Sequence, residues 1–254
     1  MIRIAAVGDI HMAPETRGTL RPAFETLPDV ADVLLLAGDL TRHGTPEEAR
    51  VVADEIRDLG VPVVAVLGNH DHHDDRPEEV TAILEDAGAQ VLEGRGVVVP
   101  CGGARVGVAG TKGFGGGFVG RSAGEFGEPL MKEFVRCSRR CADGLRTSLE
   151  RLGEQGCDVR VALTHYSPVP ETLAGEPLEI YPFLGSYLLA EAVDTAGADL
   201  AVHGHAHAGT ENGMTNGGVR VRNVAQPVIG RAFHVYHVHE REPVPAGASG
   251  GHPG

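Results

Sequence analysis

The stretch Ile2-Arg-Ile-Ala-Ala-Val-Gly-Asp-Ile-His11 joins an apolar, β-branched run to a short polar string. The same arrangement recurs after apolar runs at residues 33–37, 61–67 and 159–163. Predominantly apolar runs of this length are typical of strands in a parallel sheet that is covered on both faces. The sequence therefore predicts an α/β fold with polar side chains at the carboxyl ends of its strands, where open α/β sheets bind ligands.

Five polar strings follow one another in a fixed order along the chain. They are Gly8-Asp9-Ile10-His11, Gly38-Asp39, Gly68-Asn69-His70-Asp71, Thr164-His165 and Gly204-His205-Ala206-His207. Their side chains supply two Asp, one Asn and four His with metal-binding chemistry, and the pair His70-Asp71 lies beside them. Seven nitrogen and oxygen donors suit two divalent cations better than one.

The spacing of these residues supports a metal site. Asp9 and His11 are two residues apart, so at a strand end their side chains share one face and can bind one ion. Asp39 is an acceptor only when ionised, and its two oxygens can bridge two cations. His205 and His207 can point to different ions. Each string alone also fits an ordinary turn or helix cap, so the prediction depends on their joint occurrence.

Composition limits the partners of the chain. The net charge of −13, from 22 Lys+Arg and 35 Asp+Glu, disfavours binding to nucleic acid or to an anionic membrane. An aromatic content of only 4% and the lack of a basic stripe also count against a nuclease that acts on long DNA. Small anionic substrates held by individual side chains remain compatible with this charge. The sequence does not indicate an oligomeric state.

The expected location is the cytoplasm. No apolar stretch approaches 18 residues, and the strand predicted at residues 2–7 leaves no room for a signal peptide. The four cysteines have no C-x-x-C spacing, and we expect them to remain reduced. Cys137 and Cys141 would share a helix face, but a zinc site there lacks a second ligand pair, so free thiols are the preferred interpretation.

Strands and helices alternate along the chain, as in a layered α/β protein. Helices are predicted from Thr45-Pro46 to near Gly60, from near Asp75 to before Gly88, and at residues 129–152 and 187–194. Further strands are predicted at residues 90–92, 96–99, 105–109, 200–202, 219–224 and 233–239. We expect a single domain over residues 1–239. The Pro, Gly, Ala and Ser content predicts a disordered tail at residues 240–254.

Taken together, the strings resemble the calcineurin-like metallophosphoesterase superfamily, whose pattern is D-x-H, G-D, G-N-H-D or G-N-H-E, a lone His, and G-H-x-H. The resemblance implies a four-layer α/β/β/α sandwich with a dinuclear metal site. By this resemblance, one metal is held by Asp9, His11, Asp39 and His207, and the other by Asp39, Asn69, His165 and His205. Arg42 stands where many members have a second carboxylate, and metal binding is expected to survive this difference.

The resemblance also implies a reaction. Two divalent ions, with Mn, Fe or Zn expected, would activate a water as hydroxide for attack on a phosphodiester or phosphomonoester. His70 looks like the acid that protonates the leaving oxygen, and Asp71 is expected to orient its imidazole. A small phosphorylated substrate is expected, and a cyclic nucleotide is one candidate. The alternative is a catalytically silent metal-binding scaffold of the same fold.

Two loops are candidates for substrate selection. Residues 110–118 are rich in glycine but lack the G-K-[ST] of a P-loop. If they form a mobile lid, Lys112 or Arg121 can meet phosphate, and Phe114 or Phe118 can meet an apolar leaving group. A plain flexible connection fits the same residues. The segment 166–183, directly after His165, is a candidate for the opposite wall.

Overall fold

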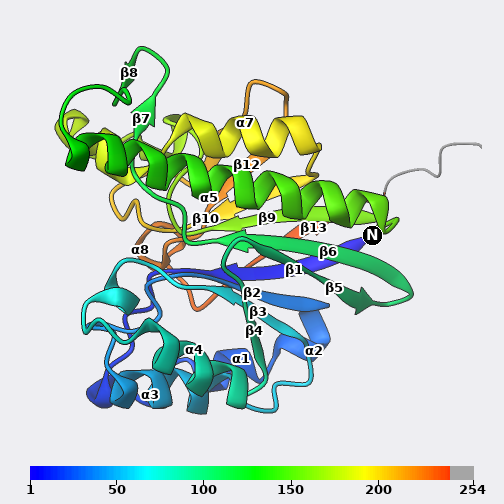
Figure 1. Ribbon diagram of the computed structural model, residues 1–254. Helices are drawn as coiled ribbons and strands as arrows, with labels where there is room; N and C mark the ends of the chain where they lie inside the picture. Colours follow the sequence, from blue (N-terminus) through cyan, green and yellow to red (C-terminus); the bar gives the residue numbers. More distant parts are fainter. Residues whose placement is uncertain (241–254) are drawn as a thin grey trace, which may run out of the picture.

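Two β-sheets stacked face to face form the centre of the protein, with helices on both outer surfaces (Figure 1). The computed structural model describes residues 1–240, so the predicted tail beyond Glu240 lies outside the described residues. In sheet order, the first sheet contains β13 (His234–Val238), β1 (Ile2–Val7), β2 (Val33–Ala37), β3 (Val63–Val66) and β4 (Ala89–Val91). The second contains β11 (Asn212–Met214), β12 (Arg220–Asn223), β10 (Leu200–His203), β9 (Val159–Thr164), β6 (Ala104–Thr111) and β5 (Arg95–Cys101).

The alternation of apolar side chains along the strands explains the four layers. Ile4, Leu35 and Val64 on one face of the first sheet pack with Val106 and Val161 of the second, and all five are fully buried. Neighbouring strand residues point to the opposite face. A sheet that is apolar on both faces needs a cover on each, so the second face of each sheet is buried under helices. The predicted α/β/β/α sandwich is confirmed.

Helices α3 (Pro46–Ile56) and α4 (Pro77–Asp86) cover the outer face of the first sheet, and α5 (Pro129–Glu154) and α7 (Tyr187–Ala196) cover the second (Figure 1). The Thr45 side chain caps α3 by accepting a hydrogen bond from Glu48 N at 3.2 Å, as the predicted capping box requires. The helix ends at Ile56, earlier than expected, because Arg57 is already extended. No helix among residues 1–240 combines the length and the apolar character needed to cross a bilayer.

Several short elements had no clear sequence pattern. The helices are α1 (Arg21–Phe24), α2 (Leu27–Val30), α6 (Tyr181–Leu184) and α8 (Gln226–Ile229). The 3₁₀ turns are η1 (Pro14–Thr16), η2 (His70–His72), η3 (Glu171–Leu173) and η4 (Leu178–Ile180), and the pair β7 (Gly117–Phe118) and β8 (Arg121–Ser122) forms a small hairpin. Each spans four residues or fewer, too few for a periodicity to be recognised.

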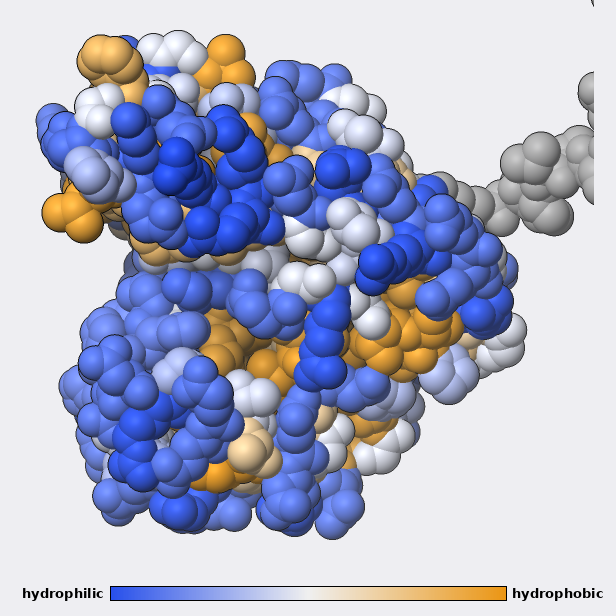
Figure 2. Space-filling model, in the orientation of Figure 1, coloured by the Kyte–Doolittle hydropathy of each residue, from blue (hydrophilic) through white to orange (hydrophobic). Residues whose placement is uncertain are grey.

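The parallel strands bring the polar strings to one end of the molecule. β1, β2 and β3 are parallel neighbours in one sheet, and β6, β9 and β10 are parallel neighbours in the other. In Figure 1, β1 runs from the N-terminus to the end of the sandwich from which the loop carrying β7 and β8 rises. The space-filling view shows a hollow at this end, between the upper part of the molecule and the lower helices (Figure 2).

Candidate metal centre

The first group of possible ligands comes from the loops after β1, β2 and β10. Asp9, His11, Asp39 and His207 each offer a ligand atom, and these atoms lie within 4.8 Å of one another. His207 Nε2 is 2.9 Å from Asp9 Oδ1. His205 N donates to both carboxylate oxygens of Asp9, at 3.0 and 2.9 Å, so the last polar string is fixed to the first.

The second group shares Asp39 with the first. Ligand atoms of Asp39, His165 and His205 also lie within 4.8 Å of one another. Asn69 Oδ1 is 3.0 Å from His165 Nε2, which places the amide oxygen beside this group. The structure thus brings together all seven residues that the sequence singled out as ligands. The carboxylate of Asp39 lies between the two groups.

Hydrogen bonds to the outer ring nitrogens orient two of the imidazoles. His165 Nδ1 is 2.9 Å from the carbonyl oxygen of Ala37, and His205 Nε2 is 3.3 Å from that of Phe183. A carbonyl oxygen can only accept, so each of these nitrogens carries a proton. Once the ring is neutral, its other nitrogen is free to bind a metal. Metal-binding histidines are commonly oriented in this way.

The backbone at the site adopts conformations that L-residues seldom adopt elsewhere. Six residues other than glycine have positive φ among residues 1–240, and four of them, Asp9, His11, Asp39 and His205, belong to the two groups. Such conformations cost free energy and tend to be retained where function needs them. The glycines of the strings allow close packing: a Cβ at Gly68 would overlap Asp39, and one at Gly204 would overlap Asp9.

Charge is unevenly distributed within the centre. Burial alone would raise the pKa of Asp39, but the charge of His165 and hydrogen bonds from His165 and His70 N outweigh it, so the pKa is lowered. Burial opposes protonation of His165, yet Asp39 raises its pKa to about 9. Burial lowers the pKa of His205 to about 3, so that ring is neutral. Without a cation, the carboxylate of Asp39 retains a proton on its nearest imidazole.

His70 projects beside the two groups. Its Nδ1 lies 2.7 Å from the carbonyl oxygen of Arg42, so it donates there, and its Nε2 lies 3.9 Å from Asp39 Oδ2. The ring is 4.5 Å from that of His11 between centroids, and the side chain is 33% exposed. The His70 ring is therefore partly open to solvent and adjacent to the candidate ligands.

Asp71 occupies a different position from the one expected. Its buried carboxylate accepts hydrogen bonds from Leu40 N, Thr41 N and Gly68 N at 3.2, 2.8 and 2.8 Å, and from Thr41 Oγ1 at 2.5 Å. The orienting contact predicted between Asp71 and the His70 ring is taken by the Arg42 carbonyl instead. Because backbone carbonyls leave no mark in the sequence, this contact could not be foreseen. The Arg42 side chain forms an ion pair with Glu15.

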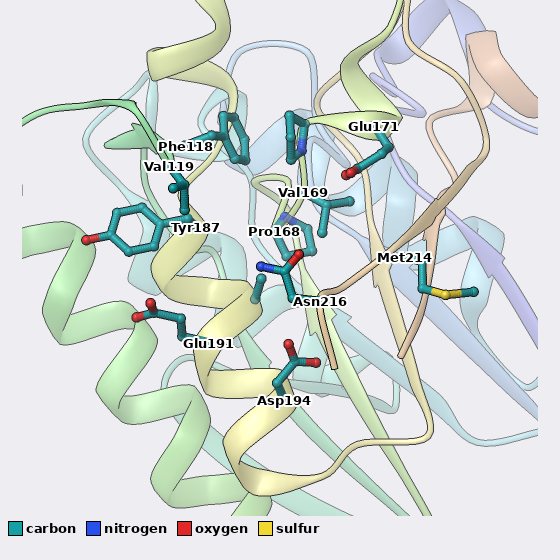
Figure 3. A pocket seen from close by; sticks show the side chains of 12 residues that line it. Phe118, Val119, Pro168, Val169, Glu171, Tyr187, Glu191, Asp194, Met214 and Asn216 are labelled. Carbon is teal, nitrogen blue, oxygen red and sulfur yellow. The ribbon is translucent and has the colours of Figure 1, made fainter. Parts of the chain in front are cut away.

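The residues expected to contact the substrate lie in different places: some are beside the metal centre and others are not. Lys112 and Phe114 lie beside Tyr166, whose ring is 4.3 Å from His205 between centroids. Arg121 is exposed on β8. Phe118 lines a separate pocket together with residues of α7, among them Tyr187 and Glu191 (Figure 3). Glu171, Glu191 and Asp194 on that pocket make it unsuited to phosphate, and none of the seven candidate ligands lines it.

The donor set fits divalent transition metals. Imidazole nitrogens together with carboxylate and amide oxygens suit Mn, Fe, Zn and similar ions. The fold and this site define the class of a metal-binding phosphoesterase. The chain belongs to the calcineurin-like phosphoesterase family, whose model matches residues 2–209. Members of this family typically bind divalent metals.

Comparison with individual proteins supports the fold. A phosphopantetheinyl hydrolase from Mycobacterium tuberculosis superposes with a TM-score of 0.65 at 16% identity, over 97% of this chain and 98% of that one. A 5'-nucleotidase precursor from Thermus thermophilus gives a TM-score of 0.53 at 16% identity, over 87% of this chain and 48% of that one. At such low identity these similarities concern the fold alone.

One curated relative is similar in sequence. It is a probable cyclic nucleotide phosphodiesterase from Synechococcus sp., 33% identical over 92 residues. The match covers 32% of this chain and 34% of the relative. The chain therefore matches about a third of the length of that protein, and its activity is not transferred by the match.

Proposed function

We propose that the protein is a dinuclear metal-dependent phosphoesterase that hydrolyses a small phosphodiester or phosphomonoester. The observation that carries the proposal is the position of Asp39, whose carboxylate belongs to both groups of ligand atoms. Asp9, His11, Asp39 and His207 would hold one cation. Asp39, Asn69, His165 and His205 would hold the other.

Two divalent cations at this place would bind phosphate oxygens and lower the pKa of a water molecule. The surrounding side chains would supply the proton donor and hold the ligands in place. The hydrogen bond from Nδ1 to the Arg42 carbonyl fixes the ring of His70, so its Nε2 can carry a proton to the leaving oxygen of the substrate. The pairing of His207 with Asp9 holds the opposite side of the site together.

For Asp71 we propose a positioning role. By accepting from Thr41 N and Gly68 N it ties the loop after β2, which carries Asp39, to the loop after β3, which carries Asn69. A carboxylate that fixes two such loops keeps the ligands at a constant separation. This role acts through the backbone and replaces the ring contact expected from the sequence.

Cyclic nucleotides are the first diester candidates. The name of the Synechococcus relative supports them. A cytoplasmic location also remains a proposal, supported by the free thiols Cys101 and Cys157, both buried.

Hydrolysis of bis(p-nitrophenyl) phosphate and of p-nitrophenyl phosphate by manganese-loaded protein tests the proposal. Turnover of either compound that chelation abolishes and that His70→Ala lowers by about 10²-fold or more is the expected result. Diester preference would direct the search to cyclic nucleotides, and monoester preference to phosphorylated metabolites. Metal binding without turnover of either compound would favour the scaffold alternative and contradict the proposal.

A further inference from the structure

Aromatic side chains are concentrated beside the candidate metal centre. The chain has only seven Phe, four Tyr and no Trp. Four of these eleven rings form a continuous series of contacts that starts at the metal centre: Tyr166, Phe114, Phe134 and Phe183, called here the aromatic wall. Successive ring centroids are 5.9, 5.1 and 6.5 Å apart.

The wall begins at residues of the second ligand group. The ring of Tyr166 is 5.6 Å from His165 and 4.3 Å from His205 between centroids. At its outer end, the carbonyl oxygen of Phe183 accepts from His205 Nε2, so this residue is also tied to the site. The wall therefore extends directly from the place where the phosphate of a substrate would bind.

The outer end of the wall is accessible. Phe183 is 60% exposed, and Phe114 and Phe134 are half-buried. Leu130 and Met131, in the first turn of the helix that carries Phe134, are exposed as well. Exposed apolar side chains next to a polar site commonly mark the place where a ligand binds.

Lys112 lies beside the part of the wall that is nearest the metal centre. It is one of two lysines in the chain, and its Nζ is 5.4 Å from the centroid of Phe114 and 5.9 Å from that of Tyr166. Its backbone oxygen accepts from His165 N and Tyr166 N, both at 3.0 Å, which fixes the residue relative to the site. Within residues 1–240 its ammonium group forms no ion pair.

A cation held over two rings and left without a carboxylate is suited to bind an anion. We propose that Lys112 and the aromatic wall form a substrate-binding subsite next to the metal centre. Lys112 binds a phosphate oxygen, and a planar aromatic group stacks against the exposed rings of the wall. This inference rests on the proposed function and specifies its substrate class as phosphoesters of nucleosides or of similar aromatic groups.

The chemistry of the wall also limits its selectivity. Phe114, Phe134 and Phe183 have no hydrogen-bonding groups, so they can recognise the face of a base but not its edge. Stacking of this kind tolerates every base because each has a π-face. The subsite should therefore distinguish aromatic from sugar-only phosphates without selecting one base over another.

A binding experiment tests the subsite separately from turnover. Calorimetry of manganese-loaded protein compares AMP with ribose 5-phosphate, which differ only in the base. We expect AMP to bind about tenfold more tightly, and GMP, CMP and UMP to bind within about threefold of AMP. Phe183→Leu and Phe114→Leu should each remove most of the difference between AMP and ribose 5-phosphate. Lys112→Gln should weaken both ligands by a similar factor, since both carry the phosphate.

Phe126→Leu is the matched control. Phe126 lies between Phe114 and Phe134 in the sequence. It is 88% exposed and takes part in none of the ring contacts formed within residues 1–240. This variant should bind AMP as the wild-type protein does. Because Phe183 is exposed, its replacement should leave the protein folded, which an unchanged urea midpoint would verify.

Three results would overturn the inference: equal affinity for AMP and ribose 5-phosphate, failure of both to bind, or a loss in Phe126→Leu as large as in Phe183→Leu. The outcomes separate this subsite from the proposed reaction. Base-dependent binding without hydrolysis of any phosphoester would retain the subsite and contradict the reaction. Hydrolysis together with equal binding of AMP and ribose 5-phosphate would retain the proposed reaction and contradict the subsite.

Discussion

Replacing Asp71 with alanine should destabilise the two loops that carry Asp39 and Asn69. The carboxylate of Asp71 is fully buried and accepts from three backbone N–H groups and the hydroxyl of Thr41. Alanine leaves these donors without a partner in a place that solvent does not reach. The effect should reach the metal centre as well, because the same carboxylate joins the loops.

The size of the effect follows from the number of donors. A buried donor left without a partner costs about 1–3 kcal/mol. Three backbone donors at the lower part of that range give a loss of about 3–6 kcal/mol in the free energy of unfolding. Since a domain is stable by only about 5–15 kcal/mol, the variant should be only marginally folded at room temperature.

Urea unfolding of the metal-free protein, followed by circular dichroism, measures this loss. Asp71→Asn should lose less stability than Asp71→Ala, because its amide oxygen can still accept, and should bind manganese more weakly than the wild type. A loss below about 1 kcal/mol in Asp71→Ala, together with unchanged manganese affinity, would refute the positioning role. Intact stability and metal binding with turnover alone reduced would also contradict it.

Three further predictions concern stability and titration. Glu55 is buried and accepts hydrogen bonds from Leu20 N and Arg21 N. Glu55→Ala should therefore lower the free energy of unfolding by about 2–4 kcal/mol, whereas Glu47→Ala, on the exposed face of the same helix, should change the urea midpoint little. The hydrogen bond from Arg3 lowers the pKa of Asp32, so its stabilising effect is present above the unfolded pKa and lost as pH falls through the folded one; the difference in urea midpoint between wild type and Asp32→Asn should therefore shrink below about pH 4. Because Asp39 raises the pKa of His165 to about 9, metal binding at pH 7 should release a proton and weaken as pH falls; calorimetry in buffers of different ionisation enthalpy would detect the release, and its absence would contradict the assignment of His165.

Much of the fold could be predicted because its central strands are predominantly apolar. The expected bounds of the strands at residues 2–7 and 33–37 agree with β1 and β2, since each run ends at a glycine that is followed by a polar residue. Short elements such as β7 and α6 were missed, because two to four residues carry no periodicity.

The residues of the candidate site could be predicted from the sequence, but the contacts that orient them could not. Residues with ligand chemistry, such as Asp39 and His165, are visible in the sequence as polar interruptions after apolar runs. The ring of His165 is oriented by the backbone carbonyl of Ala37, and the ring of His70 by that of Arg42. Any residue at these two positions would supply such a carbonyl, so the sequence does not reveal the contacts. The series of aromatic contacts through Phe183 joins distant segments of the chain, and a sequence pattern cannot reveal such contacts.

We propose that Asp39 bridges two cations, and anomalous diffraction from crystals of manganese-loaded protein would show whether it does. We expect two peaks, one beside Asp9, His11 and His207 and the other beside Asn69, His165 and His205, both within ligand distance of Asp39. A single peak, or two peaks of which only one contacts Asp39, would contradict it.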